Sequence, residues 1–470
     1  MGAMDRIRAW LTPAKASTTD YEPLAGNEPG SLEDAASRSH GAQPFSWLEY
    51  SVFGLIGVAM LWAWNMLLAA APYFQIRFRS DPWIYDNSQS AILTTFTVMN
   101  LACMLLLVNK QSKADYPFRI ITALVISAGV SALLTASTVV ADVSPRGYLA
   151  FLLLMVALTS AATGLMQNGA FSFAGAFGRP EYTQALMAGQ GVAGILPPLT
   201  QMVSYLLFSE APSSPGGTPE EQQYPPRKEE AGSALEKSEG STAAFIYFLT
   251  AVLISAVTLV AFIPLVRRHA RDRRNEPDSS FSSSTQQPQQ RTPLLTLLLK
   301  LRWLVASIFT CFVVTMFFPV FTAKILSVRD PATAGKLFSP GAFIPLAFFF
   351  WNLGDLLGRV ATAVDGLSAP FRRRPKVLFA ISLARCGFLP LYLLCNLHGG
   401  GAKFGGDVFY LVGVQLMFGL TNGWLGSSTM MAAGEWVEEE ERAATGGFMS
   451  LCLVAGLAGG SVLSFAAAGV

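Results

Sequence analysis

Charged side chains are scarce in this chain: only 14% of its residues are Asp, Glu, Lys or Arg, whereas 52% are hydrophobic. Soluble globular domains carry about 25% charged residues, so the composition excludes the ordinary soluble classes of enzyme and binding module. The five cysteines lie in apolar segments and show no paired spacing typical of a metal site or a disulfide framework. The net charge is only +2 and is spread over many segments, so no basic face is available for nucleic acid.

Catalytic fingerprints are absent as well. No P-loop, dinucleotide-binding or zinc motif appears in the sequence. The apolar segments contain no combination of nucleophile and base, and no set of metal ligands, that would suit a membrane-embedded enzyme. We therefore predict a protein that is not an enzyme, with no catalytic residue, no metal site and no cofactor.

What the sequence does contain is a series of apolar stretches, each long enough to cross about 30 Å of hydrocarbon as a helix. We predict an all-α polytopic membrane protein in which eleven helices span the lipid bilayer. The expected spans are residues 47–72, 88–109, 119–141, 148–175, 183–208, 243–266, 301–325, 341–364, 376–397, 407–431 and 444–468.

Lysine and arginine residues are concentrated in alternate connections between these spans. Short cytoplasmic loops retain such cations, so the pattern predicts that the amino terminus is cytoplasmic. The cations that we assign to cytoplasmic loops on this basis are Lys110, Lys113 and Arg119, then Arg179, then the cluster from 267 to 274, and finally Arg372, Arg373, Arg374 and Lys376.

Three polar segments set the expected domain boundaries. Residues 1–44 are predicted to be a disordered cytoplasmic tail, and "YEPL" at 21–24 has the tyrosine-x-x-bulky form of a sorting signal. The segment 209–242 is predicted to be a long non-cytoplasmic loop inside an N-terminal bundle of six helices, residues 45–266. A cytoplasmic linker, 267–299, then leads to a C-terminal bundle of five helices, residues 300–470.

The run "FFFWNLGDLLGRVATAV", 348–364, places a carboxylate and a guanidinium inside an apolar span. A charge at the centre of a spanning helix costs about 2.5–3.5 kcal/mol and is usually paired or faces a water-filled cavity. Asp355 and Arg359 are four residues apart, so they lie on one helical face together with Asn352. Two interpretations remain open. The two charges neutralise each other near a helix end, or they bind a polar solute in an aqueous chamber.

Other polar residues within the spans are equally ambiguous from their chemistry alone. Gln167 and Asn168 lie in the apolar run "GLMQNGAFSFAG". An amide can recognise the edge of a nucleobase, but it can also join two helices by a hydrogen bond worth about 1 kcal/mol. Pro319, in "MFFPVFTAKILS", is expected to kink its helix.

Several stretches together resemble the equilibrative nucleoside transporter family. They occur in the order of the family's helices, from about residue 55 to about residue 465. The stretches are "LWAWNMLLAAAPYF", "YTQALMAGQGVAG", "FFPVFT", "FFFWNLGDLLGRVATAV", "LTNGWLGSSTMM" and "AATGGFMSLCLVAGLAGGSVLSF". Three positions depart from the family pattern: Ala63, Thr163 and Asn168.

The resemblance implies a major-facilitator-like arrangement of six plus five helices around a central cavity, with nucleosides, and nucleobases as a further candidate, moving by alternating access. Asp355 and Arg359 would hold the ribose hydroxyls and Gln167 the nucleobase. The long tail and the loops are similar to those of fungal members, which are often vacuolar, and "YEPL" would then be read by sorting machinery. The residues implied to line the cavity are Leu61, Trp64, Met99, Phe318, Phe348 and Asn352.

Two rival functions are compatible with the residues. One is a major-facilitator-type porter of another small polar metabolite, either driven by protons or not. The other is a non-transporting receptor or scaffold in which the buried pair is structural. We favour facilitative nucleoside transport, in which the partners are the substrate and the lipid bilayer and the concentration gradient supplies direction.

Overall fold

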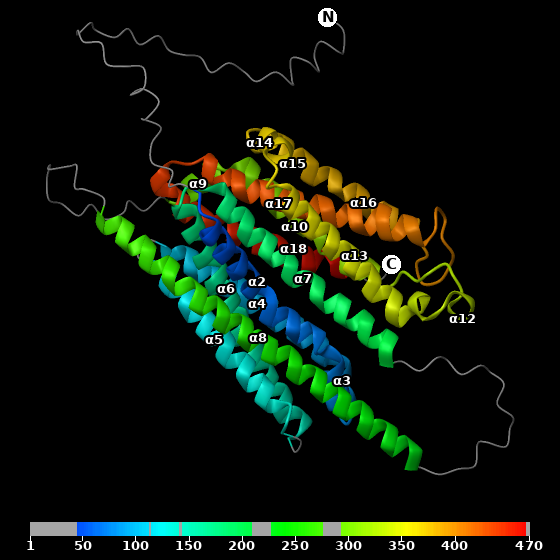
Figure 1. Cartoon of the computed structure of the whole chain (residues 1–470). Helices are drawn as coiled ribbons and strands as arrows, with labels where there is room; N and C mark the ends of the chain where they lie inside the picture. Colours follow the sequence, from blue (N-terminus) through cyan, green and yellow to red (C-terminus); the bar gives the residue numbers. More distant parts are fainter. Residues whose placement is uncertain (1–44, 112–113, 141–142, 209–226, 276–292, 467–470) are drawn as a thin grey trace, which may run out of the picture. The chain divides into compact units, whose positions relative to one another are not determined.

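The part of the chain that the structure describes folds almost entirely into helices (Figure 1). The computed structural model describes residues 45–111, 114–140, 143–208, 227–275 and 293–466, which all belong to one compact unit, Gln43–Val470. The predicted tail, residues 1–44, lies outside the described residues, so neither its predicted disorder nor its sorting signal is tested.

We define the N-terminal half as the helices up to residue 275 and the C-terminal half as those from residue 294 onward. The N-terminal half contains α2 (Trp47–Ala69), α3 (Ala71–Phe78), α4 (Pro82–Asn109), α5 (Tyr116–Ser137), α6 (Pro145–Ala176), α7 (Pro180–Phe208) and α8 (Arg227–Asn275). The C-terminal half contains α9 (Leu294–Lys300), α10 (Arg302–Thr315), α11 (Phe317–Thr322), α12 (Pro331–Ala334), η3 (Lys336–Phe338), α13 (Pro340–Ala361), α14 (Asp365–Arg372), α15 (Pro375–Ala384), η4 (Arg385–Gly387), α16 (Phe388–Tyr392), η5 (Phe409–Leu416), α17 (Met417–Glu435) and α18 (Glu439–Ala466).

Local sequence signals explain where several of these helices begin. Asp81, Asp115 and Ser144 each accept a hydrogen bond from the backbone N–H three residues later, at the starts of α4, α5 and α6. A proline follows within the first two helical positions of all three. Such a cap satisfies an otherwise unpaired donor, and proline is tolerated there because its missing N–H is not needed.

The expected membrane spans are all helical, although not all of them are continuous. Within the described residues, eight helical segments are long and apolar enough to cross a membrane. The other three expected spans correspond to α7, to α15–η4–α16 and to η5–α17; the second of these contains a 3₁₀ turn, and the third begins as a π-helix. The all-α membrane fold is therefore confirmed, and the count of eleven crossings stays a prediction.

The predicted kink at Pro319 appears as a break in the seventh expected span. Helix α10 ends at Thr315 and α11 begins at Phe317. The ring of a proline collides with the carbonyl four residues earlier, which is that of Thr315, so the break lies where this collision requires it.

The two long polar connections are shorter than predicted because α8 extends into both. Residues 227–242 were assigned to a loop and residues 267–275 to a linker, but α8 runs from Arg227 to Asn275. The first extension is rich in Glu, Lys and Ala and the second in Arg, residues that favour helix, and neither extension contains proline. The domain boundaries themselves stay a prediction.

Glycines allow two pairs of helices to pack closely on either side of the candidate site. A Cβ atom on Gly354 or Gly358 of α13 would lie 2.1 Å from the carbonyl oxygen of Leu416 or Leu420, respectively. The glycines that flank Asp355 therefore form a helix-packing groove. On the other side, a Cβ atom on Gly189 of α7 would lie 2.0 Å from the carbonyl oxygen of Gly54 in α2.

Candidate functional site

Asp355 and Arg359 form a buried ion pair on α13. The Nε of Arg359 donates to Oδ2 of Asp355 at 2.6 Å, and the two residues are 6% and 4% exposed, respectively. The prediction that Asp355 and Arg359 lie on one face of the helix is thus confirmed, because residues four apart on a helix are neighbours on its surface. A charged pair with so little exposure is stable only when its remaining donors and acceptors are also satisfied.

The second oxygen of the carboxylate is held by an asparagine from another helix. Asn422 of α17 donates through its Nδ2 to Oδ1 of Asp355 at 2.7 Å, and Asn422 is 1% exposed. This contact fixes the orientation of the carboxylate within the C-terminal half. The sequence held a signal for it, because Asn422 is an amide within the apolar run "LTNGWLG".

The guanidinium reaches from the C-terminal half to α7 of the N-terminal half. Nη1 of Arg359 donates to the carbonyl oxygen of Met187 at 2.9 Å and to Oε1 of Gln190 at 3.2 Å. In return, Nε2 of Gln184 donates to the backbone carbonyl of Arg359 at 3.1 Å. The pair therefore joins the two halves, and the sequence interpretation missed these partners on α7.

Aromatic side chains lie along α13 on the N-terminal side of the pair. Phe318 stacks on Trp351 with ring centroids 4.0 Å apart and planes at 3°, and it meets the edge of Phe348 at 5.4 Å. The half-buried Asn352 donates to the carbonyl of Phe348 at 2.8 Å. The structure thus brings together the predicted site residues of the C-terminal half.

The predicted site residues of the N-terminal half lie on three helices. Leu61 and Trp64 are half-buried on α2, and Trp64 stacks on Phe96 of α4 at 3.7 Å. Met99 of α4 is 38% exposed. Gln167 of α6 is only 4% exposed, yet its amide makes no hydrogen bond with any residue in the described ranges. No described hydrogen bond links these four residues to Asp355 or Arg359.

Asn168 has the structural role that was one of its two open interpretations, and its partner Arg119 was not expected. Arg119 was assigned to a cytoplasmic loop, but it lies in the first turn of α5 and is 8% exposed. Its Nη1 donates to Oδ1 of Asn168, and its Nη2 donates to the carbonyl of Lys110 at 3.2 Å. Of the two neighbouring amides, Asn168 therefore joins helices, whereas Gln167 remains available.

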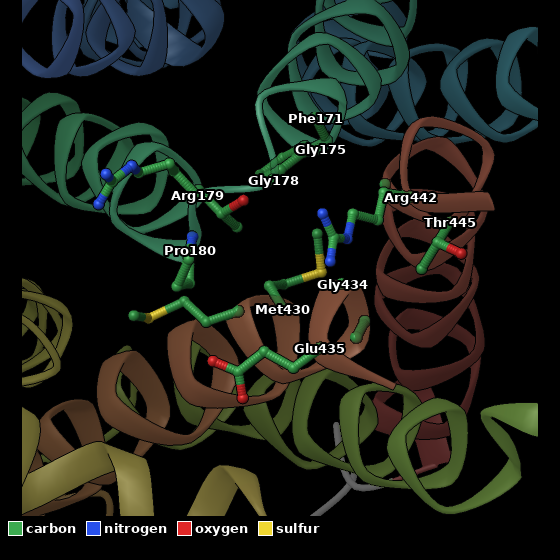
Figure 2. A pocket seen from close by; sticks show the side chains of 14 residues that line it. Phe171, Gly175, Gly178, Arg179, Pro180, Met430, Gly434, Glu435, Arg442 and Thr445 are labelled. Carbon is green, nitrogen blue, oxygen red and sulfur yellow. The ribbon is translucent and has the colours of Figure 1, made fainter. Parts of the chain in front are cut away.

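A cavity of about 70 Å³ lies where the α6–α7 turn meets α17 and α18. Figure 2 shows the side chain of Arg442 extending from α18 toward Gly178, whose φ is +66°.

At the same end, Arg372 of α14, also predicted to be a loop cation, is 7% exposed and pairs with Glu435 at 3.1 Å. Burial raises the pKa of the Glu435 carboxyl group, while the nearby Arg372 opposes this shift.

A second cavity, of about 160 Å³, lies at the same end of the helices. Tyr50 and Gln184 are part of its lining, and the hydroxyl of Tyr50 donates to Oε1 of Gln184 at 2.6 Å. Gln184 in turn contacts the backbone of Arg359. Asp355 and Arg359 do not line either of these two cavities, and the expectation that the pair faces an aqueous chamber stays a prediction.

The sequence profile described as Nucleoside transporter matches residues 153–215 and 266–468, which is more than half of the chain. The chain is 28% identical to Nucleoside transporter FUN26 of Saccharomyces cerevisiae, an alignment that covers 89% of this chain and 83% of that protein. It is 25% identical to Equilibrative nucleoside transporter 1 of Homo sapiens, over 91% of this chain and 98% of that protein.

Solved structures of similar shape belong to the major facilitator superfamily. The transporter FucP in the outward conformation matches with a TM-score of 0.52 and 15% identity, covering 90% of this chain and 96% of that chain. At this level of identity the match shows the fold alone, and it confirms the predicted major-facilitator-like architecture. The helices, their apolar composition and the matching sequence profile agree: this multi-pass membrane protein belongs to the nucleoside transporter family.

Proposed function

We propose that the chain carries nucleosides across a membrane by facilitated diffusion, with nucleobases as further candidate substrates. The observation that carries the proposal is the match of more than half of the chain to the nucleoside transporter family. The relatives from yeast and human, named as nucleoside transporters, support the same substrate class. The fold shared with major facilitator transporters supports a mechanism in which the two halves rock around a midplane site.

In this mechanism the ribose replaces protein contacts that now cover the ion pair. Met187 and Gln190 of α7 accept hydrogen bonds from Arg359 across the boundary between the halves. When α7 and α13 separate, the N–H groups of Arg359 that bind α7 become free. Asn422 continues to hold Asp355 within the C-terminal half. A vicinal diol can then donate to the carboxylate and accept from the guanidinium, so the polar groups do not remain unpaired.

The nucleobase is assigned to the N-terminal half. Gln167 has both an amide donor and an amide acceptor, which suit the edge of a base, and it has no hydrogen-bond partner among the described residues. The aromatic ring of Trp64 offers a flat apolar surface on this side of the base, and Phe318 offers another from the C-terminal half. Leu61, Met99, Phe348 and Asn352 complete the proposed lining.

The orientation and the location of the protein are also proposals. The distribution of lysine and arginine between the helices favours a cytoplasmic amino terminus. We assign the protein to a vacuolar or other endomembrane, or to the plasma membrane, with sorting machinery recognising "YEPL" in the N-terminal tail.

The proposed function is tested by uptake of labelled adenosine and uridine into proteoliposomes, with and without a pH gradient. We expect uptake that stops at equal inside and outside concentrations and that does not require the gradient. Absence of uptake of any nucleoside would contradict the substrate class. A strict requirement for the pH gradient would contradict facilitated diffusion and favour a proton-coupled porter.

A further inference from the structure

Arg385 is a buried cation in the C-terminal half, and no described carboxylate contacts it directly. It lies in the short turn η4 between α15 and α16 and is 2% exposed. Within the described part of the chain it forms no ion pair. A charged side chain inside a spanning segment is costly to bury and is rare unless it has a function.

Neutral groups satisfy the guanidinium of Arg385. Nη1 donates to the carbonyl of Cys311 at 2.7 Å, Nη2 donates to Oγ1 of Thr315 at 3.3 Å, and Nε donates to Oγ1 of Thr421 at 3.3 Å. The guanidinium also lies 4.7 Å from the ring centroid of Phe418. These contacts hold the cation firmly in place but do not neutralise its charge.

A chain of hydrogen bonds connects Arg385 to the proposed ribose site. Oγ1 of Thr315 contacts Oδ1 of Asn422 at 2.6 Å, and Nδ2 of Asn422 donates to Oδ1 of Asp355 at 2.7 Å. Thr315 and Asn422 are 5% and 1% exposed, so no bulk water separates the charges. The connected network therefore contains two guanidinium groups, those of Arg359 and Arg385, and one carboxylate.

We propose that Arg385 is a specificity-determining residue that gives the site around Asp355 an excess positive charge and so excludes nucleosides with a cationic base. The inference rests on the proposed function, because it concerns which nucleosides the same site accepts. In a buried site of low dielectric constant, an unneutralised elementary charge acts over several ångströms, so it disfavours a cation well beyond its own contacts.

The test compares two methylated substrates of the same size in proteoliposomes. The base of 1-methyladenosine is cationic at neutral pH, whereas that of N6-methyladenosine is neutral. The measured quantity is the ratio of their initial uptake rates, which a general loss of active protein does not change. Arg385→Met removes the charge, and Arg385→Lys retains it.

We expect Arg385→Met to raise the ratio of cationic to neutral uptake about tenfold, and Arg385→Lys to leave it close to that of the unmodified protein. The matched control is Arg119→Met, because Arg119 is a second buried arginine without a carboxylate partner among the described residues. Its hydrogen bonds lead to Asn168 and Lys110 and not to Asp355, so its ratio should not change.

An unchanged ratio in Arg385→Met, or an equal rise in Arg385→Lys or Arg119→Met, would overturn the inference. If Arg385→Met does not fold, as judged by size-exclusion chromatography, Arg385→Gln provides a second neutral variant that keeps a donor toward Thr315. If the unmodified protein carries no nucleoside at all, neither the adenosines nor uridine, the proposed function itself fails. If it carries nucleosides while the uptake ratio does not change with the residue at position 385, only the role of Arg385 fails.

Discussion

The two halves of the molecule hold different polar side chains around the candidate site. In the C-terminal half, a carboxylate and two guanidinium groups share one hydrogen-bonded network through Asn422 and Thr315. In the N-terminal half, the buried Arg119 is held by the neutral amide of Asn168, and Gln167 beside it makes no hydrogen bond with a described residue.

From this difference we propose a division of recognition between the halves. Ionised groups make the stronger and more directional hydrogen bonds, which suits the hydroxyl groups of a sugar. A neutral amide contributes less to affinity but can read the donor and acceptor pattern of a base. Substitutions in the C-terminal half should therefore reduce transport of every nucleoside, and substitutions in the N-terminal half should change the preference among bases.

The largest effect is expected for Asp355→Asn. Removing one partner of a buried ion pair costs about 3–5 kcal/mol, so we expect nucleoside uptake in proteoliposomes to fall at least about a hundredfold for all bases. Asp407→Asn is the matched control. Asp407 is a second buried aspartate of the C-terminal half, 6% exposed, but its side chain accepts from Ser327 and from the backbone of Val328.

The control should lower the melting temperature and retain most of the uptake. An equal loss of uptake in Asp355→Asn and Asp407→Asn would show that any buried aspartate of this half is equally sensitive. The charged network would then have no special role in transport, and the contrast between the halves would disappear.

A smaller effect is expected for Asn422→Ala. The substitution leaves Oδ1 of Asp355 without its donor, and an unpaired buried acceptor costs about 1–3 kcal/mol, so KM should rise about tenfold for all nucleosides. Ser428→Ala on the same helix is the control, because the hydroxyl of Ser428 is buried and has no partner among the described residues. Equal KM values for Asn422→Ala and the unmodified protein would argue against the positioning of Asp355 by Asn422.

Gln167→Leu should have a selective effect. A hydrogen bond to the base contributes about 0.5–1.5 kcal/mol, so we expect KM to rise about three- to tenfold, by different factors for adenosine and uridine. Asn168→Leu should lower the melting temperature and leave the ratio of the two KM values unchanged. A uniform change for both bases in Gln167→Leu would contradict the division between the halves.

The smallest effect concerns the ion pair of Arg372 and Glu435, whose glutamate side chain is 34% exposed. Burial raises the pKa of Glu435, so the folded protein binds the proton more tightly than the unfolded chain does. This group therefore lowers stability at neutral pH, and the penalty disappears as the pH falls through the raised pKa. Glu435→Gln should raise the melting temperature slightly at pH 7.5 and by less at pH 5. A larger gain at pH 5 would contradict this sign.

The sequence predicted the helices well because long apolar runs have few alternatives to a membrane-spanning helix. It also placed Asp355 and Arg359 correctly on one face, because that relation depends only on the helical repeat. The full length of α8 could not be predicted from hydropathy. Its two polar extensions are helical because of the intrinsic helix propensity of their residues and not because they are buried.

The partners of the pair could not be predicted in the same way. Gln190 and Asn422 meet Arg359 and Asp355 across distant parts of the chain, and only the packing of α7 and α17 on α13 brings them together. Arg385 could have been identified, because it is a charge within an expected apolar span, 376–397, and the rule that selected Asp355 applies equally to it. Its connection to the same hydrogen-bonded network depends on tertiary packing, which the sequence alone does not show.

The central claim is that Asp355 receives the ribose hydroxyls, and it is tested most directly by comparing adenosine with 2′,3′-dideoxyadenosine. The Kd of each nucleoside is measured for the purified unmodified protein and for Asp355→Asn. The four values form a thermodynamic cycle in which the ribose hydroxyls and the carboxylate are removed separately and together. We predict that the unmodified protein prefers adenosine about tenfold or more and that this preference largely disappears in Asp355→Asn. An undiminished preference for adenosine in Asp355→Asn would contradict the account.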